Sequence, residues 1–147
     1  MRFDLVDRVL ESSTESATTL KAVSMAEEYL QDHFPGFPVL PGVFMLEAMV
    51  QAARVVARAR GETAPLTIGE VRGLKYNRFV APGCSLRVRV DLLGTDAGSL
   101  SFKGAAVLIE PGHDGEPPVS ATGRFTLRPV CVAGGECTPV GLSSPGA

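Results

Sequence analysis

The sequence predicts an α+β domain in which an antiparallel β-sheet wraps around one long central helix. A single long helical pattern occupies residues 42–60, its first half is apolar on nearly every side, and strand-like segments both precede and follow it. This order lacks the alternation of strands and helices that is typical of a parallel sheet, so the strands should pair antiparallel. A helix that is apolar all round needs cover on most sides, and a curved sheet supplies that cover.

The other elements are short apolar and β-branched runs separated by turn-forming residues. We expect strands over residues 3–10, 18–23, 66–75, 85–93, 100–109 and 119–127, and a short helical turn over residues 26–30. The pattern is clearest where Leu86, Val88 and Val90 alternate with Arg87 and Arg89. A period of two predicts a strand with one buried and one exposed face.

Length and charge exclude several classes of protein. The 147 residues suffice for one domain with its own core, which we expect to span residues 1–130, followed by a flexible C-terminal tail over residues 131–147. A net charge of −2 offers no basic field for nucleic acid. The most apolar stretch, residues 43–59, carries Glu47 and Arg54, so we expect no membrane span. Because the first residues are charged where a signal peptide would be apolar, we expect a cytoplasmic protein.

The apolar half of the helix contains one carboxylate. Glu47 and Gln51 are four residues apart and therefore share a face, which Arg54 and Arg58 continue. A carboxylate in apolar surroundings is costly unless it is hydrogen-bonded, paired or used in chemistry. Glu47 is therefore either a catalytic group or half of an ion pair, with Arg54 or Arg58 of another chain as a candidate partner.

A proline-rich segment, HFPGFPVLPG, connects the helical turn to the helix. Its prolines hold the backbone extended and leave it few alternative conformations. His33 begins the segment, and Gly42 ends it at the helix start, where a backbone N–H is unpaired and the dipole favours negative charge. An imidazole, a backbone donor and the carboxylate of Glu47 thus lie within fifteen residues. A histidine in such a place is usually structural or solvated, so spacing alone leaves its role open.

The stretch HFPGFPVLPGVFMLEAMVQAA, residues 33–53, closely resembles the signature of FabZ-type 3-hydroxyacyl-ACP dehydratases of the FabA/FabZ family. That signature combines His-Phe-Pro, Pro-Val-x-Pro-Gly-Val and Glu-Ala followed by Gln, and His33 and Glu47 have its spacing. A looser match covers residues 3–128. The resemblance implies a hot-dog fold and an enzyme that dehydrates ACP-linked 3-hydroxyacyl thioesters to trans-2-enoyl thioesters in fatty-acid or related acyl-chain synthesis.

The resemblance also implies roles for individual residues. His33 would be the base that removes the proton beside the thioester carbonyl, and Glu47 the acid that protonates the leaving hydroxyl. The Gly42 N–H would stabilise the charge on the carbonyl oxygen. Other substrate-binding positions would be Val43, Phe34, Gln51 and Tyr76, with Gln51 supporting Glu47. Because acyl carrier protein is acidic, the carrier requires local positive charge, and Arg54, Lys75 and Arg78 are the candidate contacts, unless they are only solvated surface charges.

No cofactor and no metal are expected. The implied partners are acyl carrier protein or CoA as thioester carrier, and further copies of the chain in a homodimer or a trimer of dimers. Three other functions remain open: a hot-dog thioesterase that uses Glu47 to activate water, an enoyl-CoA hydratase, and a non-catalytic acyl-binding subunit. Release of free thiol would identify the thioesterase, and acyl binding without conversion would identify the non-catalytic subunit.

Overall fold

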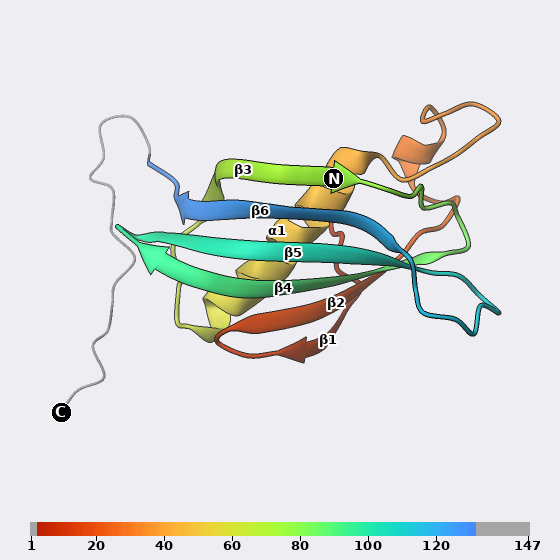
Figure 1. Ribbon diagram of the computed structural model, residues 1–147. Coiled ribbons are helices and arrows are strands. Elements are labelled where there is room, and N and C mark those ends of the chain that lie inside the picture. Colours follow the sequence, from red (N-terminus) through yellow and green to blue (C-terminus); the bar gives the residue numbers. More distant parts are fainter. Residues whose placement is uncertain (1–2, 132–147) are drawn as a thin grey trace.

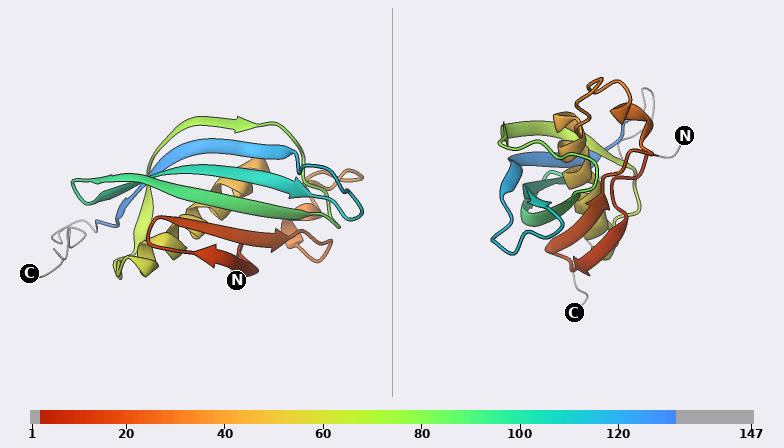
Figure 2. Two further views of the ribbon diagram at one scale, coloured as in Figure 1. Left: turned by 60° about the horizontal axis from the view of Figure 1, so that its bottom comes forward. Right: turned by 90° about the vertical axis from the view of Figure 1, so that its right-hand side faces the viewer.

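In the part of the chain that the structure describes, six antiparallel strands form one sheet that curves around a single long helix (Figures 1 and 2). The computed structural model describes residues 3–131. In chain order the elements are β1 (Arg8–Ser12), β2 (Ser16–Ala22), the 3-10 turn η1 (Glu28–Leu30), α1 (Gly42–Ala59), β3 (Leu66–Tyr76), β4 (Ser85–Asp96), β5 (Ser99–Ile109) and β6 (Val119–Pro129). The sheet order is β1-β2-β4-β5-β6-β3, and every neighbouring pair is antiparallel. The predicted α+β class is confirmed.

The first strand is the element whose predicted bounds differ most from the structure. A strand was expected over residues 3–10, whereas β1 covers Arg8–Ser12. Leu5 is buried, and its backbone N–H donates to the side-chain oxygen of Gln51 on the helix at 2.8 Å. The ladder with β2 begins only at Asp7, whose N–H donates to the Leu20 carbonyl. The segment before β1 therefore packs against the helix and does not extend the sheet.

The end of α1 follows from its local sequence. Gly61 has a φ of +87°, a conformation that glycine adopts without the steric cost of a Cβ. The Gly61 N–H donates to the Arg58 carbonyl at 2.9 Å, and the Glu62 N–H donates to the Ala57 carbonyl at 3.0 Å. This bonding pattern is a Schellman motif, which satisfies carbonyls that the helix leaves unpaired. The helix therefore ends within one residue of the predicted helical pattern over residues 42–60.

The core lies between α1 and the inner face of the sheet. Alternate residues of β4, namely Leu86, Val88 and Val90, are buried, while Arg87 and Arg89 between them are exposed. The helix contributes the buried side chains Met45, Ala48, Met49, Val50, Ala52, Ala53, Val56 and Ala57. Small alanines on this face allow the helix to approach the strands closely. The helix is therefore held along most of its length, and the side chains at its start are placed by the same packing.

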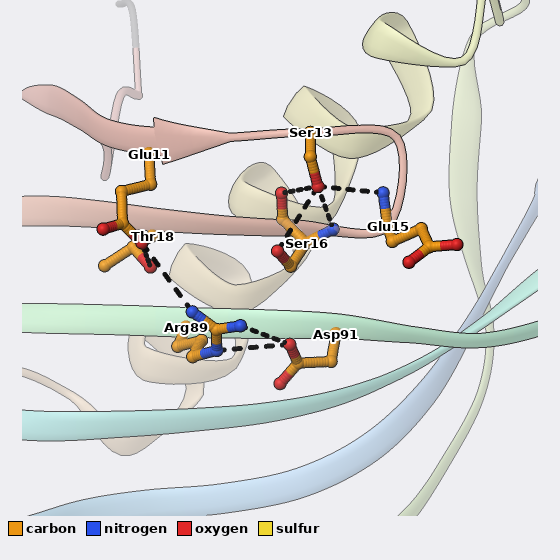
Figure 3. A network of polar contacts seen from close by, with 7 residues as sticks. All are labelled: Glu11, Ser13, Glu15, Ser16, Thr18, Arg89 and Asp91. Carbon is orange, nitrogen blue, oxygen red and sulfur yellow. Dashed lines mark hydrogen bonds and ion pairs between the residues drawn. The ribbon is translucent and has the colours of Figure 1, made fainter.

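A polar network on β1, β2 and β4 joins the strands at one edge of the sheet (Figure 3). The Arg89 guanidinium lies 2.9 Å from an Asp91 carboxylate oxygen and 3.8 Å from Glu11. In the β1–β2 turn, the Ser13 hydroxyl accepts hydrogen bonds from the N–H groups of Glu15 and Ser16. The charged side chains of this network are about half or more exposed, so each pair contributes at most about 1 kcal/mol.

The opposite edge of the sheet is formed by β3. Within residues 3–131, β3 pairs with β6 on one side and with no strand on the other. No helix in this part of the chain is both long and apolar enough to cross a membrane. The expected tail over residues 131–147 lies outside the described residues except for Cys131.

Candidate active site

The proline-rich segment that carries His33 is fixed by its own backbone hydrogen bonds. The N–H of Val39 donates to the His33 carbonyl at 2.9 Å, and Phe34 and Phe37 exchange hydrogen bonds at 3.1 and 3.0 Å. The Leu40 N–H donates to the Val80 carbonyl at 2.8 Å, which ties the segment to the residues that follow β3. The position of His33 is therefore set by a closed network of the main chain.

The imidazole of His33 has a defined orientation. Its Nδ1 lies 2.9 Å from the carbonyl oxygen of Val39, and its ring stacks on Phe34 with a centroid separation of 4.3 Å. A carbonyl oxygen only accepts hydrogen bonds, so Nδ1 must carry the proton. In the neutral ring, the lone pair then resides on Nε2, the atom that a general base uses.

A cavity of about 420 Å³ opens beside this ring. Its lining combines the imidazole with apolar and polar side chains from the loop, the helix start and the segment after β3. The lining residues are His33, Phe34, Leu40, Gly42, Val43, Met45, Tyr76, Asn77, Arg78 and Phe79. Three of the apolar ones are largely solvent-exposed: Phe34 at 53%, Val43 at 62% and Phe79 at 68%. A mainly apolar cavity with a few polar groups is the usual form of a small-molecule site.

Gly42, at the start of α1, and Tyr76, at the end of β3, lie against each other and both line this cavity. The start of α1 and the end of β3 are neighbours in Figure 1. A Cβ on Gly42 would lie 3.1 Å from two atoms of the Tyr76 ring, so only glycine lets the ring pack on the helix start without displacement. As the first residue of α1, Gly42 has an N–H without an intrahelical partner, at the positive end of the helix dipole. Burial raises the pKa of the Tyr76 phenol, which therefore stays neutral at ordinary pH.

Glu47 lies on α1, four residues after Val43, and is half-buried. Its Oε1 accepts a hydrogen bond from the Gln51 side-chain amide at 3.0 Å and one from Arg54 Nη1 at 3.3 Å. Gln51 is held in turn, because its own oxygen accepts from the Leu5 N–H. Glu47 is therefore paired within its own chain, whereas the sequence left open an arginine of another chain.

One chain does not bring His33 and Glu47 into one cavity. Among the described residues, Glu47 is absent from the lining of the His33 cavity, although Val43, one helical turn earlier, belongs to it. A second, larger groove of about 650 Å³ begins beside Arg54 and is bounded by Arg58, the residues after the helix and Leu66. Arg54, which holds Glu47, thus lies between the Glu47 carboxylate and this second groove.

The remaining predicted residues divide between the two regions. Arg78 lines the His33 cavity, and Lys75 is exposed near the end of β3. Arg54 contacts Glu47 and the Leu66 carbonyl. Sequence reasoning missed Asn77 in the cavity lining, since only its position after a strand distinguishes it. Residues 3–131 contain no group of three or more His, Cys, Asp or Glu side chains arranged to hold a metal.

The fold and the cavity together define a hot-dog protein with an apolar site beside a histidine. Solved structures agree on the fold. The dehydratase heterocomplex ApeI:P from Xenorhabdus doucetiae matches with a TM-score of 0.69 at 23% identity, over 88% of this chain and 85% of that one. The TT0310 protein from Thermus thermophilus matches with a TM-score of 0.60 at 15% identity, over 84% and 91% of the two chains. The predicted hot-dog fold is confirmed.

Sequence similarity identifies the family. The model of the family described as FabA-like domain matches residues 1–110 of this chain. The chain is 42% identical to the 3-hydroxyacyl-(acyl-carrier-protein) dehydratase FabZ of Polynucleobacter necessarius, over 86% of this chain and 83% of that protein. The corresponding FabZ of Thermus thermophilus is 39% identical over 86% and 87% of the two chains. The chain belongs to the FabZ-type 3-hydroxyacyl-ACP dehydratases of this family. The predicted family and the predicted class of hydro-lyase are confirmed.

Proposed function

We propose that this chain removes water from 3-hydroxyacyl thioesters of acyl carrier protein, with His33 as the base. The observation that carries the assignment of the base is the 2.9 Å contact between His33 Nδ1 and the Val39 carbonyl. Nε2 takes the proton from the carbon beside the thioester carbonyl, and the electron pair of that C–H bond becomes the new C=C bond. The Gly42 N–H donates to the carbonyl oxygen as it gains negative charge.

Glu47 acts on the hydroxyl of the substrate's third carbon, which is bonded to the carbon that loses its proton to His33. As the bond between the substrate's third carbon and its hydroxyl oxygen breaks, Glu47 gives its proton to that oxygen and water departs. Both donors that hold Glu47, the Gln51 amide and Arg54, lie on Oε1. Oε2 is therefore the oxygen assigned to the substrate. The trans-2-enoyl thioester leaves, and solvent restores the proton to Glu47 and removes one from His33.

Two copies of the chain supply the complete site. The edge of β3 that pairs with no strand within residues 3–131 suits antiparallel pairing with β3 of a second copy about a two-fold axis. Such pairing places the start of one β3, at Leu66, beside the end of the other, at Tyr76. The Leu66 carbonyl accepts a hydrogen bond from Arg54, whose guanidinium also binds the Glu47 carboxylate. Tyr76, in contrast, lines the His33 cavity. The His33 of one copy then faces the Glu47 of the other, and exposed Val43 and Phe79 are covered.

Acyl carrier protein is the proposed thioester carrier. Carrier proteins are acidic, so the rim of the cavity must offer positive charge although the whole chain has a net charge of −2. Arg78 lines the cavity and Lys75 is exposed near it. These two cations are the proposed contacts to the carrier, and the acyl chain enters between the apolar side chains around them.

The proposal is tested by following short 3-hydroxyacyl and enoyl thioesters, on acyl carrier protein and on CoA, by mass spectrometry. Wild-type protein is compared with His33→Ala and Glu47→Gln. Water loss or gain that both substitutions abolish supports the assignment, and the carrier series then separates dehydratase from enoyl-CoA hydratase. Release of free thiol in place of water indicates a thioesterase. Acyl-carrier binding without conversion in folded wild-type protein contradicts the proposal and indicates a non-catalytic subunit.

A further inference from the structure

Arg54 makes two directed contacts from the second half of α1. Its Nη1 lies 3.3 Å from Glu47 Oε1, seven residues earlier on the same helical face. Its Nη2 donates to the Leu66 carbonyl, at the start of β3, at 3.2 Å. The Arg54 side chain is 36% exposed and that of Glu47 is 30% exposed, so both are partly withdrawn from solvent. Using both terminal nitrogens restricts the guanidinium to one orientation.

The contacts of Arg54 and Gln51 fall on one oxygen of Glu47 and leave the other for a ligand. Gln51 donates to Oε1 at 3.0 Å, and Arg54 donates to the same atom. Gln51 is itself anchored, since it accepts from the Leu5 N–H at 2.8 Å and donates to the Phe3 carbonyl at 3.1 Å. Oε1 of Glu47 is therefore held by two donors: Gln51, which is anchored to the chain before β1, and Arg54, which is anchored to the start of β3. A carboxylate clamped at one oxygen has its other oxygen pointed in a fixed direction.

We infer that Arg54 is a positioning residue of the dehydration reaction, which sets the rotamer of Glu47 so that Oε2 meets the substrate hydroxyl. The inference rests on the proposed function and refines it: Arg54 belongs to the catalytic apparatus and is not a contact for the carrier. Two of the five N–H donors of the Arg54 guanidinium already bind a carboxylate and a carbonyl of its own chain, and these contacts hold it against Glu47 and β3. Its removal should slow the chemical step and leave substrate binding unchanged.

Arg58 provides a matched control. It lies one helical turn after Arg54, borders the same groove and is exposed. It carries the same charge, so an effect due merely to the local electrostatic field should be similar at both positions. An effect transmitted through Glu47 should occur only at Arg54.

The experiment measures kcat and KM for dehydration of one 3-hydroxyacyl chain on acyl carrier protein and on CoA, for wild type, Arg54→Leu, Arg54→Lys and Arg58→Leu. We expect kcat of Arg54→Leu to fall about 10- to 100-fold on both carriers, the size typical of a misplaced catalytic group, with little change in KM. Arg54→Lys, which can still donate to Oε1, should recover part of kcat. Arg58→Leu should behave as wild type. Arg54→Gln replaces Arg54→Leu if thermal melting shows that the latter does not fold.

Three results overturn the inference. One is a kcat for folded Arg54→Leu within about twofold of wild type. Another is an equal loss in Arg58→Leu. The third is a rise in KM confined to the acyl carrier protein substrate and abolished by salt, which assigns Arg54 to carrier docking. Glu47→Gln, assayed in parallel, tests the proposed function separately, because full activity of that variant would remove Glu47 itself from the mechanism.

Discussion

The Nδ1 atom of His33 lies 2.9 Å from the carbonyl oxygen of Val39, six residues further along the same loop. This contact assigns the ring proton to Nδ1 and leaves Nε2 as a base, and the group that orients the ring is a backbone carbonyl. The loop holds both partners rigidly, since the Val39 N–H also donates to the His33 carbonyl. The loop backbone thus does the orienting that a third side chain does in many catalytic sites.

Replacement of His33 tests the role of the base. His33→Ala should lower kcat for dehydration about 10²- to 10⁴-fold, the usual contribution of a general base, because the cavity lining contains no second imidazole and no carboxylate that could replace it. Steady-state kinetics on a 3-hydroxyacyl thioester measure the loss. His113→Ala, in an exposed turn, is the control and should retain full activity. Equal rates for wild type and His33→Ala would assign the base elsewhere.

The packing of Tyr76 on Gly42 predicts a coupling between these residues. Gly42→Ala should destabilise the protein by about 1–2 kcal/mol, because the new Cβ would lie 3.1 Å from the Tyr76 ring. In a Tyr76→Ala background the same change should cost nothing. Urea denaturation of the four proteins gives the coupling energy. Gly94→Ala, whose added Cβ would meet no atom within 4 Å, is the control. Additive effects of the two substitutions would contradict the proposed contact.

Lys21 predicts how stability depends on pH. It is 6% exposed and lies 2.7 Å from Glu27 and 3.4 Å from Asp7, which joins β2 to the segments before β1 and η1. Burial alone would lower the pKa of Lys21, but the hydrogen bond and the charges of the two carboxylates outweigh it and raise the pKa above 10.5. The stabilisation is therefore complete below pH 10.5 and is lost as pH rises through the raised value.

Lys21→Met should accordingly cost about 2–3 kcal/mol at pH 7, since the two carboxylates lose their partner but keep some contact with water. The difference from wild type should stay constant up to about pH 10 and shrink above it. Chemical denaturation across this pH range provides the measurement. Lys103→Met, at an exposed site on β5, should change stability by no more than about 0.5 kcal/mol. A difference that grows as pH rises above about 10 would have the wrong sign for this ion pair.

Charge reversal at Arg78 tests carrier recognition. Arg78→Glu should raise KM about tenfold for the acyl carrier protein substrate at low salt, because the acidic carrier is then repelled at the cavity rim. The effect should diminish at high salt and be small for short acyl-CoA substrates. Arg87→Glu, exposed on β4 away from the cavity lining, is the charge-matched control. An unchanged KM for Arg78→Glu would exclude Arg78 as a carrier contact.

Local patterns in the sequence predict most of the fold. The period of two places β4, and the glycine after Arg60 places the end of α1. The start of β1 was beyond such reasoning, because it depends on a hydrogen bond between Leu5 and Gln51, which are 46 residues apart. The strand propensity of residues 3–7 is overridden by packing against the helix.

In the candidate site, too, some features could be predicted from the sequence, whereas others depend on contacts between distant residues. His33, Gly42 and Tyr76 could be assigned by resemblance to the family, and the structure places all three at one cavity. The sequence suggested Arg54 or Arg58 of another chain as a partner of Glu47, but it did not predict the pairing with Arg54 of the same chain. That pairing depends on the rotamers of two long side chains and on the Leu66 carbonyl, which belongs to another element. The seven-residue spacing on one helical face was the signal available, and it does not distinguish a contact from two separate surface charges.

The central claim is that His33 of one copy works with Glu47 of another, and mixed dimers test it most directly. His33→Ala and Glu47→Gln are co-expressed with different tags, and the doubly tagged dimer is purified and assayed for dehydration. If the site is shared, each mixed dimer has one intact site and one doubly impaired site, so activity should return to about half of the wild-type value per dimer. Each variant alone should be inactive. Mixed dimers as inactive as the two parents would show that both residues must come from the same chain, contrary to the proposed assembly.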